Sequence, residues 1–199
     1  MLKRQLTNLI EAGTDEAGRG CLAGPVTAAA VIFPKNISIP KINDSKKLTE
    51  NQRNQLCKEI ESKSIAFSVQ HVMQNEIDKL NILNASIKAM HKALEKLSLY
   101  PEFIAVDGNK FKNFKKIPHK CIIKGDSKFQ HIAAASILAK TYRDKYMKLI
   151  HQKFEKYYWE NNKGYPTKKH REAIKKYGVT IHHRKSFNLF SKQTELNLF

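Results

Sequence analysis

Acidic side chains are scarce in this sequence, which has 18 Asp and Glu residues against 36 Lys and Arg residues. The resulting formal net charge of +18 at pH 7 points to a negatively charged partner. It favours a polyanion, and nucleic acid fits better than an acidic membrane surface. The basic residues are concentrated after residue 140, so we expect one face of the protein to bind phosphates.

Cysteine is also scarce, and the three thiols Cys21, Cys57 and Cys121 lie far apart without any CxxC pair. The sequence therefore has neither a disulfide framework nor a zinc-site spacing. The first residues show no signal-peptide pattern. No apolar run approaches the roughly 20 residues that span a bilayer. We expect a monomeric cytoplasmic protein with reduced thiols and no membrane contact.

Helix and strand patterns follow one another along the 199 residues. Apolar runs and turn signals predict strands over Leu9–Thr14, Val26–Phe33, Ser64–Val72, Phe103–Val106 and His119–Ile123. Spacings of three and four residues predict helices over Glu50–Lys63, Asn84–Ser98, Ser127–Tyr158 and Lys168–Tyr177. Capping-box patterns mark two of the helix starts, at Thr49 with Gln52 and at Ser127 with Gln130.

This order of elements predicts an α/β fold, with a mixed β-sheet flanked by helices. A tight turn joins the first two strands, so the sheet should begin antiparallel and continue parallel. The apolar residues of the long helix, from Ile132 to Leu149, should face the sheet. We expect one continuous domain, with a catalytic core over residues 1–158 and a basic helical extension and tail over 159–199.

Four acids stand at the borders of predicted strands: Asp15 and Glu16, then Asp107, then Asp126. Taken singly, each has an ordinary explanation. Asp107 suits a turn, Asp126 could stabilise a helix dipole, and Glu16 could pair with Arg19. In sheets of this kind, however, sites form beyond the strand ends. Together the four acids predict a common site.

A cluster of carboxylates repels itself and needs a cation. Oxygen ligands suit Mg²⁺ or Mn²⁺ better than Zn²⁺, and paired ions suit in-line attack of water on a phosphodiester. Successive strand residues point to opposite faces, so a shared site requires an irregular backbone near Asp15 and Glu16. Gly13, Gly18 and Gly20 would permit a bulge there.

Motifs along most of the chain occur in one family order. A lone Asp-Glu-x-Gly-Arg-Gly is weakly specific, but the whole ordered set resembles the bacterial ribonuclease HII (type 2 ribonuclease H) family. The matching segments are Gly13–Gly20, Leu22–Val26, Asp44–Leu48, Asp107–Gly108, Lys124–Asp126, Ile132–Lys140, Arg143–Asp144, Gly164–Thr167 with His170, and His183–Phe187.

The resemblance implies a ribonuclease H-like fold with a small helical C-terminal extension. It implies an endoribonuclease that hydrolyses the RNA strand of RNA–DNA hybrids. The same enzyme would cut 5′ to ribonucleotides embedded in duplex DNA, leaving a 3′-hydroxyl and a 5′-phosphate. It assigns metal binding and catalysis, with Mn²⁺ or Mg²⁺, to Asp15, Glu16, Asp107 and Asp126.

Substrate binding is implied for a second set of residues. Gly18, Arg19 and Gly20 would read the ribose 2′-hydroxyl at an RNA–DNA junction, and Tyr165 would stack on the next deoxyribose. A 2′-hydroxyl is what separates RNA from DNA, and close backbone approach needs glycine. Candidate phosphate contacts are Lys46, Lys140, Arg143, Lys168, Lys169 and Arg184.

Four alternatives stay open at this point. The chain could be a non-catalytic nucleic-acid-binding module, although a binder would gain by losing carboxylates that repel phosphate. Arg143 and Asp144 could form only an ion pair on a helix face, and His182-His183 could be surface or structural residues. The tail Glu195–Phe199 resembles a clamp-binding Gln-Leu-x-Leu-Phe peptide, with Glu in place of Gln, or it could dock on the protein itself.

Overall fold

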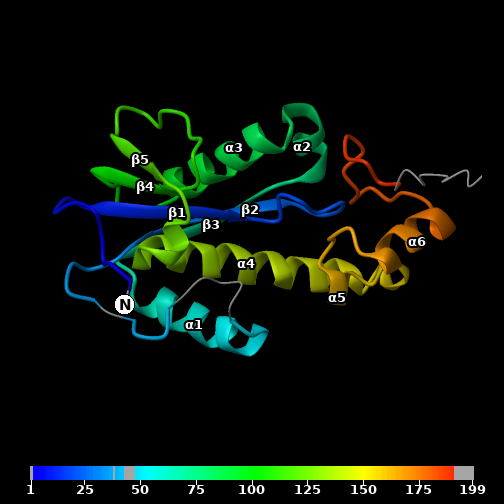
Figure 1. Cartoon of the computed structure of the whole chain (residues 1–199), viewed down its shortest axis with the longest axis horizontal. Coiled ribbons are helices and arrows are strands. Elements are labelled where there is room, and N and C mark those ends of the chain that lie inside the picture. Colours follow the sequence, from blue (N-terminus) through cyan, green and yellow to red (C-terminus); the bar gives the residue numbers. More distant parts are fainter. Residues whose placement is uncertain (1, 38, 43–47, 191–199) are drawn as a thin grey trace, which may run out of the picture.

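The computed structural model describes residues 2–37, 39–42 and 48–190. Within these residues, five strands form one mixed sheet in the order β3-β2-β1-β4-β5 (Figure 1). Pairing is antiparallel among the first three strands and parallel from β1 to β4 and β5, as predicted. The strands are β1 (Glu11–Ala17), β2 (Val26–Ile32), β3 (Ala66–Val72), β4 (Phe103–Asp107) and β5 (His119–Ile122).

Helices cover both faces of the sheet (Figure 1). One face carries α3 (Ile82–Glu95), with α2 (Gln74–Leu80) beside it. The other face carries α4 (Gln130–His151), and α1 (Glu50–Lys63) packs against α4. The short helix α5 (Trp159–Asn162) and α6 (Lys168–Tyr177) follow α4 at one end of the molecule.

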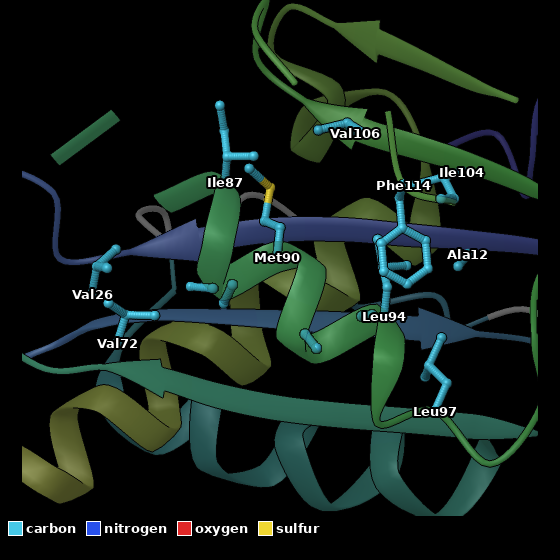
Figure 2. Packing of buried hydrophobic residues seen from close by; sticks show 14 of the residues in the cluster. Ala12, Val26, Val72, Ile87, Met90, Leu94, Leu97, Ile104, Val106 and Phe114 are labelled. Carbon is cyan, nitrogen blue, oxygen red and sulfur yellow. The ribbon is translucent and has the colours of Figure 1, made fainter. Parts of the chain in front are cut away.

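The two cores follow from the alternation of β2. Ala28 and Ala30 face the α3 side, where Met90 and Leu94 point toward the sheet (Figure 2). Ala29 belongs to the core on the α4 side. Because strand residues alternate between faces, a central strand covered on both sides must be apolar throughout, as the Val-Thr-Ala-Ala-Ala-Val-Ile of β2 nearly is.

A close approach fixes α4 on the sheet. A side chain at Gly13 of β1 would place its Cβ 2.4 Å from the carbonyl carbon of His131, so only glycine fits. Next to this contact, His131 Nε2 lies 2.6 Å from the Glu11 carboxylate in a fully enclosed pair. Glu11 also accepts hydrogen bonds from the backbone of Leu6 and Thr7, which ties the N-terminal segment to α4.

Several predicted elements are confirmed. The α1 helix has the predicted bounds, and its Thr49–Gln52 capping box is formed on both sides. The α6 helix has the predicted bounds, with Thr167 as its side-chain cap and Gly178 at its end. The apolar residues Ile87, Met90, Leu94 and Leu97 of the predicted Asn84–Ser98 helix are buried, although α3 itself ends at Glu95.

Predictions at the ends of the long helix were wrong. α4 begins at Gln130, because Ser127 belongs to a short 3-10 turn and its hydroxyl donates to Lys124. α4 ends at His151, before the turn of residues 155–157. Leu149, predicted to face the sheet, is 62% exposed, because the last turns of α4 extend past the sheet.

The predicted irregularity in β1 was also wrong. β1 continues past Thr14 to Ala17, and its pairing with β2 runs without a break from Ala12 to Ala17. No bulge separates Asp15 from Glu16, so the two carboxylates leave a regular strand on opposite sides. The helix α2 had not been predicted.

The C-terminal part has its own apolar cluster, centred on Trp159 and Ile174 and completed by Leu22 and Met147. Backbone hydrogen bonds join it to the loop after β1, from Leu22 N to Gly164 O at 2.7 Å and from Arg184 N to Leu22 O at 2.8 Å. In the described part of the chain, no helix is both long and apolar enough to cross a membrane.

Candidate metal and nucleic-acid site

Three of the predicted acids meet where β1 and β4 lie side by side. Thr14 of β1 is opposite Val106 of β4, so Asp15 and Asp107 follow at neighbouring positions. The Asp107 carboxylate accepts hydrogen bonds from the backbone N–H of Gly125 at 2.7 Å and of Asp126 at 3.3 Å. This contact brings the Lys124–Asp126 turn, and the buried Asp126, against the end of β4.

Electrostatics in this cluster disfavour bare carboxylates. Asp15 is only 5% exposed, and burial raises its pKa well above the usual value, with the charges of Glu16 and Asp107 adding to the effect. A hydrogen bond from Ser136 opposes that increase only in part. Burial also raises the pKa of Glu16, although Arg19 at 3.1 Å opposes it.

This donor set fits a hard divalent cation, because its ligands are carboxylate oxygens that repel each other without a positive charge. The described residues do not present three His, Cys, Asp or Glu side chains close enough to hold an ion as they stand. The fit therefore rests on the chemistry and electrostatics of the acids. The proposed ion pair of Arg19 with Glu16 is present and coexists with the cluster.

A groove of about 320 Å³ joins the acids to the predicted substrate residues. We call it the Tyr165 groove. It is lined by Asp15, Glu16, Asp107, Ala17, Gly18, Arg19, Gly20, Ser136, Lys140 and Tyr165. Asp126 does not line it, and Lys46 lies outside the described residues. The groove thus brings together seven of the residues predicted for catalysis or substrate binding. They are Asp15, Glu16, Asp107, Gly18, Arg19, Gly20 and Tyr165.

Lys140 completes the positive side of this groove. Its ammonium lies 5.5 Å from the centre of the Tyr165 ring and 2.7 Å from Asp144. Asp144 also pairs with Arg53 at 3.4 Å. Asp144 is therefore held by Lys140 and Arg53, and the alternative of an Arg143–Asp144 pair on the helix face was wrong.

Arg143 is fully buried, so its prediction as a phosphate contact was wrong. Its guanidinium donates to the carbonyls of Pro25 at 2.9 Å, Ala23 at 3.0 Å and Lys163 at 2.8 Å. It also lies beneath Gly18, where an added Cβ would stand 2.0 Å from Arg143 Nε and where φ is +91°. Arg143 of α4 therefore packs directly against Gly18 and hydrogen-bonds the segment that follows the Gly-Arg-Gly motif.

Arg184 is the second buried guanidinium and was wrongly predicted as a phosphate contact too. It donates to the carbonyls of Gly24 at 3.0 Å and Arg19 at 2.9 Å. Burial, followed by the charge of Arg143, lowers the pKa of Arg184 to about 10, so it stays a cation at neutral pH. Neither the Tyr-Arg-Asp context of Arg143 nor the His-Arg-Lys context of Arg184 indicates in the sequence that the side chain is buried.

A buried aromatic network supports Tyr165 from below. The indole N–H of Trp159 donates to His170 Nε2 at 2.9 Å, so the proton of neutral His170 sits on Nδ1 and is donated to the Tyr165 carbonyl at 2.9 Å. His183 lies 3.3 Å from His170, which makes it structural, one of its two predicted roles. Tyr165 itself remains 39% exposed and lines the groove.

Comparison with known proteins decides the family. A sequence model described as Ribonuclease HII matches residues 12–190. The chain belongs to the ribonuclease HII family. A ribonuclease HII from Christiangramia forsetii is 59% identical over 197 residues, which cover 99% of this chain and 100% of that protein.

Solved structures of relatives share the fold. The crystal structure of a ribonuclease H2 from Pyrococcus horikoshii is similar with a TM-score of 0.77 and 27% identity, covering 90% of this chain and 94% of the other. A complex of PCNA with ribonuclease HII from Archaeoglobus fulgidus contains a chain with a TM-score of 0.75 and 26% identity, covering 94% and 98%. The fold class and the enzyme class predicted from the sequence are thereby confirmed, since ribonuclease HII enzymes are metal-dependent nucleases with ribonuclease H activity.

Proposed function

We propose that the protein hydrolyses the RNA strand of RNA–DNA hybrids and cuts 5′ to ribonucleotides embedded in duplex DNA. The observation that carries the proposal is the Tyr165 groove, in which the buried Asp15 and the half-buried Glu16 and Asp107 share one surface with Gly18–Gly20 and the exposed Tyr165. A site for phosphodiester hydrolysis and a site for inspecting a sugar are thus adjacent. Cutting would then depend on recognition of a ribonucleotide.

Asp15, Glu16, Asp107 and Asp126 would hold Mn²⁺ or Mg²⁺, which when bound supplies charge stabilisation and an activated water. The raised pKa values of Asp15 and Glu16 support this role, because a bound cation would relieve the cost of their ionisation. Asp107 has a second duty. It orients the Lys124–Asp126 turn through its hydrogen bonds with the backbone of Gly125 and Asp126.

Recognition would come from the exposed backbone of Arg19 and Gly20, whose approach to a ribose is not blocked by a side chain at Gly20. Tyr165 would pack on the following deoxyribose, and the hydrogen bond from His170 to its backbone carbonyl would keep it in position. Lys46, Lys140, Lys168 and Lys169 would bind phosphates, and the net charge of +18 predicts steep salt dependence. Arg143 and Arg184 would hold the reading loop, Gly18–Gly20, in a fixed position.

Duplex DNA with one embedded ribonucleotide tests the proposal directly. We expect the wild-type protein with Mn²⁺ or Mg²⁺ to cut only 5′ to that ribonucleotide, leaving a 3′-hydroxyl. Asp15→Asn should abolish cutting while binding persists, whereas Glu172→Gln on the exposed side of α6 should change neither. Turnover by Asp15→Asn comparable to wild type would contradict the assignment of this carboxylate.

We also propose that residues 1–158 and 159–199 act as one unit in a cytoplasmic monomer. The backbone bonds of Leu22 to Gly164 and Arg184 support this union. The three free cysteines suit a reducing compartment. Size-exclusion chromatography with light scattering tests the monomer: a single peak at the mass of one chain is expected.

A sliding clamp is the proposed protein partner. The archaeal relative forms a complex with PCNA, and the tail Glu195–Phe199, outside the described residues, carries a Leu-Asn-Leu-Phe end. Removal of residues 193–199 should abolish clamp binding and leave cleavage of a short duplex unchanged. Equal clamp affinity of the full chain and the truncated chain would contradict this proposal.

A further inference from the structure

A second hollow lies next to the acids, on the side of the sheet that α3 covers. It has a volume of about 220 Å³, and we call it the α3 hollow. Glu16, Arg19 and Asp107 line both this hollow and the Tyr165 groove. Because α3 and α4 cover opposite faces of the sheet, the two hollows flank the acids on opposite sides.

The floor of the α3 hollow holds an unusual serine. Ser86 of α3 is 1% exposed, and its hydroxyl has no hydrogen-bond partner among the residues that the structure describes. Its neighbours in the hollow include Ile87 and Met90, which are buried and apolar. A buried hydroxyl without a partner costs stability, and alanine, found nearby at Ala85 and Ala89, would suit this helix better.

The α3 hollow has the chemistry of a sugar site. Ile87 and Met90 offer apolar surface for the carbon face of a furanose ring, and Ser86 offers one hydroxyl to a hydroxyl of that ring. Asn109 and Lys110 are exposed at the rim, where an amide and an ammonium can bind the attached phosphate.

The direction of the strand follows from the proposed function, on which this inference rests. The nucleotide 3′ to the ribonucleotide packs on Tyr165, so the strand must leave the acids on the opposite side toward its 5′ end. We propose that the α3 hollow binds the sugar of the nucleotide directly upstream of the cut. There Ser86 hydrogen-bonds the 2′-hydroxyl when that sugar is a ribose.

This assignment gives the protein a second point of discrimination. A deoxyribose upstream leaves the Ser86 hydroxyl unpaired, whereas a ribose satisfies it. Runs of RNA would then be cut faster than isolated ribonucleotides in DNA. Ser86 is a specificity-determining residue in this scheme, and the four acids remain the catalytic residues.

Two duplexes that differ by one oxygen atom test the inference. Both carry the same RNA–DNA junction, and the nucleotide upstream of the cut is a ribonucleotide in one and a deoxyribonucleotide in the other. For wild type we expect kcat/KM at the mapped junction cut to be about three- to tenfold higher with the upstream ribose, the usual effect of one hydrogen bond. Ser86→Ala should bring this ratio close to one and preserve cutting of the upstream deoxyribose substrate.

Two further variants make the test specific. Ser98→Ala makes the same chemical change at an exposed position and should keep the wild-type ratio. Ser86→Thr keeps a hydroxyl and should retain part of the preference. An unchanged ratio in Ser86→Ala, an equal loss on both duplexes, or a wild-type ratio of one would each overturn the inference. Absence of cutting at the junction by wild type would instead overturn the proposed function, and the inference with it.

Discussion

Replacing Arg143 by methionine distinguishes a buried support from a phosphate contact. The guanidinium satisfies three carbonyls, those of Ala23, Pro25 and Lys163, in a site with no solvent exposure. Methionine fills a similar length of space but donates no hydrogen bond. Each carbonyl left without a partner costs about 1–3 kcal/mol, and part of that cost is offset because no charge is buried any longer.

The expected net loss is about 4 kcal/mol of unfolding free energy, a large share of the 5–15 kcal/mol typical of a domain. For a chain of this size, such a loss lowers Tm by roughly 10 °C. Thermal melting followed by circular dichroism measures it. Lys145→Met, an exposed neighbour on the same helix, should change stability by less than about 0.5 kcal/mol.

Binding to a hybrid at several salt concentrations supplies the second readout. If Arg143 touched a phosphate, Arg143→Met would lower the log–log salt slope by about one and leave Tm unchanged. The buried geometry predicts the reverse: an unchanged slope and a lower Tm. An unchanged Tm together with a shallower slope would refute the assignment of Arg143 as a support for the Gly-Arg-Gly backbone.

Three further predictions concern the acids, the histidines and the reading loop. Asp15→Asn should raise Tm in the presence of EDTA at neutral pH, because it removes a carboxyl whose raised pKa makes ionisation costly. The same variant should show a smaller gain in Tm on addition of Mn²⁺. Scanning fluorimetry measures both effects, and a lower Tm in EDTA would count against the electrostatic explanation. Burial lowers the pKa of His183 from 6.5 to about 4, so the unfolded chain takes up its proton first, and stability present above pH 6.5 is lost as the pH falls toward 4. Denaturant titrations read by the fluorescence of Trp159, the single tryptophan, should show this loss, and His183→Asn should flatten it. Gly18→Ala should destabilise the fold, because its Cβ would lie 2.0 Å from a guanidinium nitrogen at a φ of +91°. The Cβ of Gly20→Ala would meet nothing within 4 Å, so this variant should retain the wild-type Tm but lose cleavage at a single ribonucleotide. Equal melting temperatures for the two variants would contradict the packing around Gly18.

The local pattern of apolar residues predicted most of the fold. The spacing of apolar residues found all five strands of the described sheet and the bounds of α1 and α6, because one face or one stripe of each must meet the core. Errors arose at element ends. Ser127 looked like a helix cap, yet the turn over Gly125–Ser127 holds the chain against Asp107 before the helix can begin.

For the candidate site, too, the sequence predicted one part correctly and another part wrongly. Acids at strand ends predicted the cluster of Asp15, Glu16 and Asp107, because parallel neighbouring strands end at one edge of the sheet. The expected bulge was unnecessary. Glu16 lines the hollows on both sides of the sheet, so two carboxylates on opposite faces of a regular strand end can still serve one site.

By itself the sequence determined the order of strands and helices, the placement of acids at strand ends and a net charge that favours a polyanionic partner, since each depends on residues close together along the chain or on composition. Tertiary structure alone decided which arginines are buried and which carbonyls they bind. Arg143 finds its acceptors Pro25 and Ala23 at separations of 118 and 120 residues, and Arg184 finds Gly24 at 160. A guanidinium can be buried only where such distant carbonyls converge, and a helical pattern cannot show that convergence.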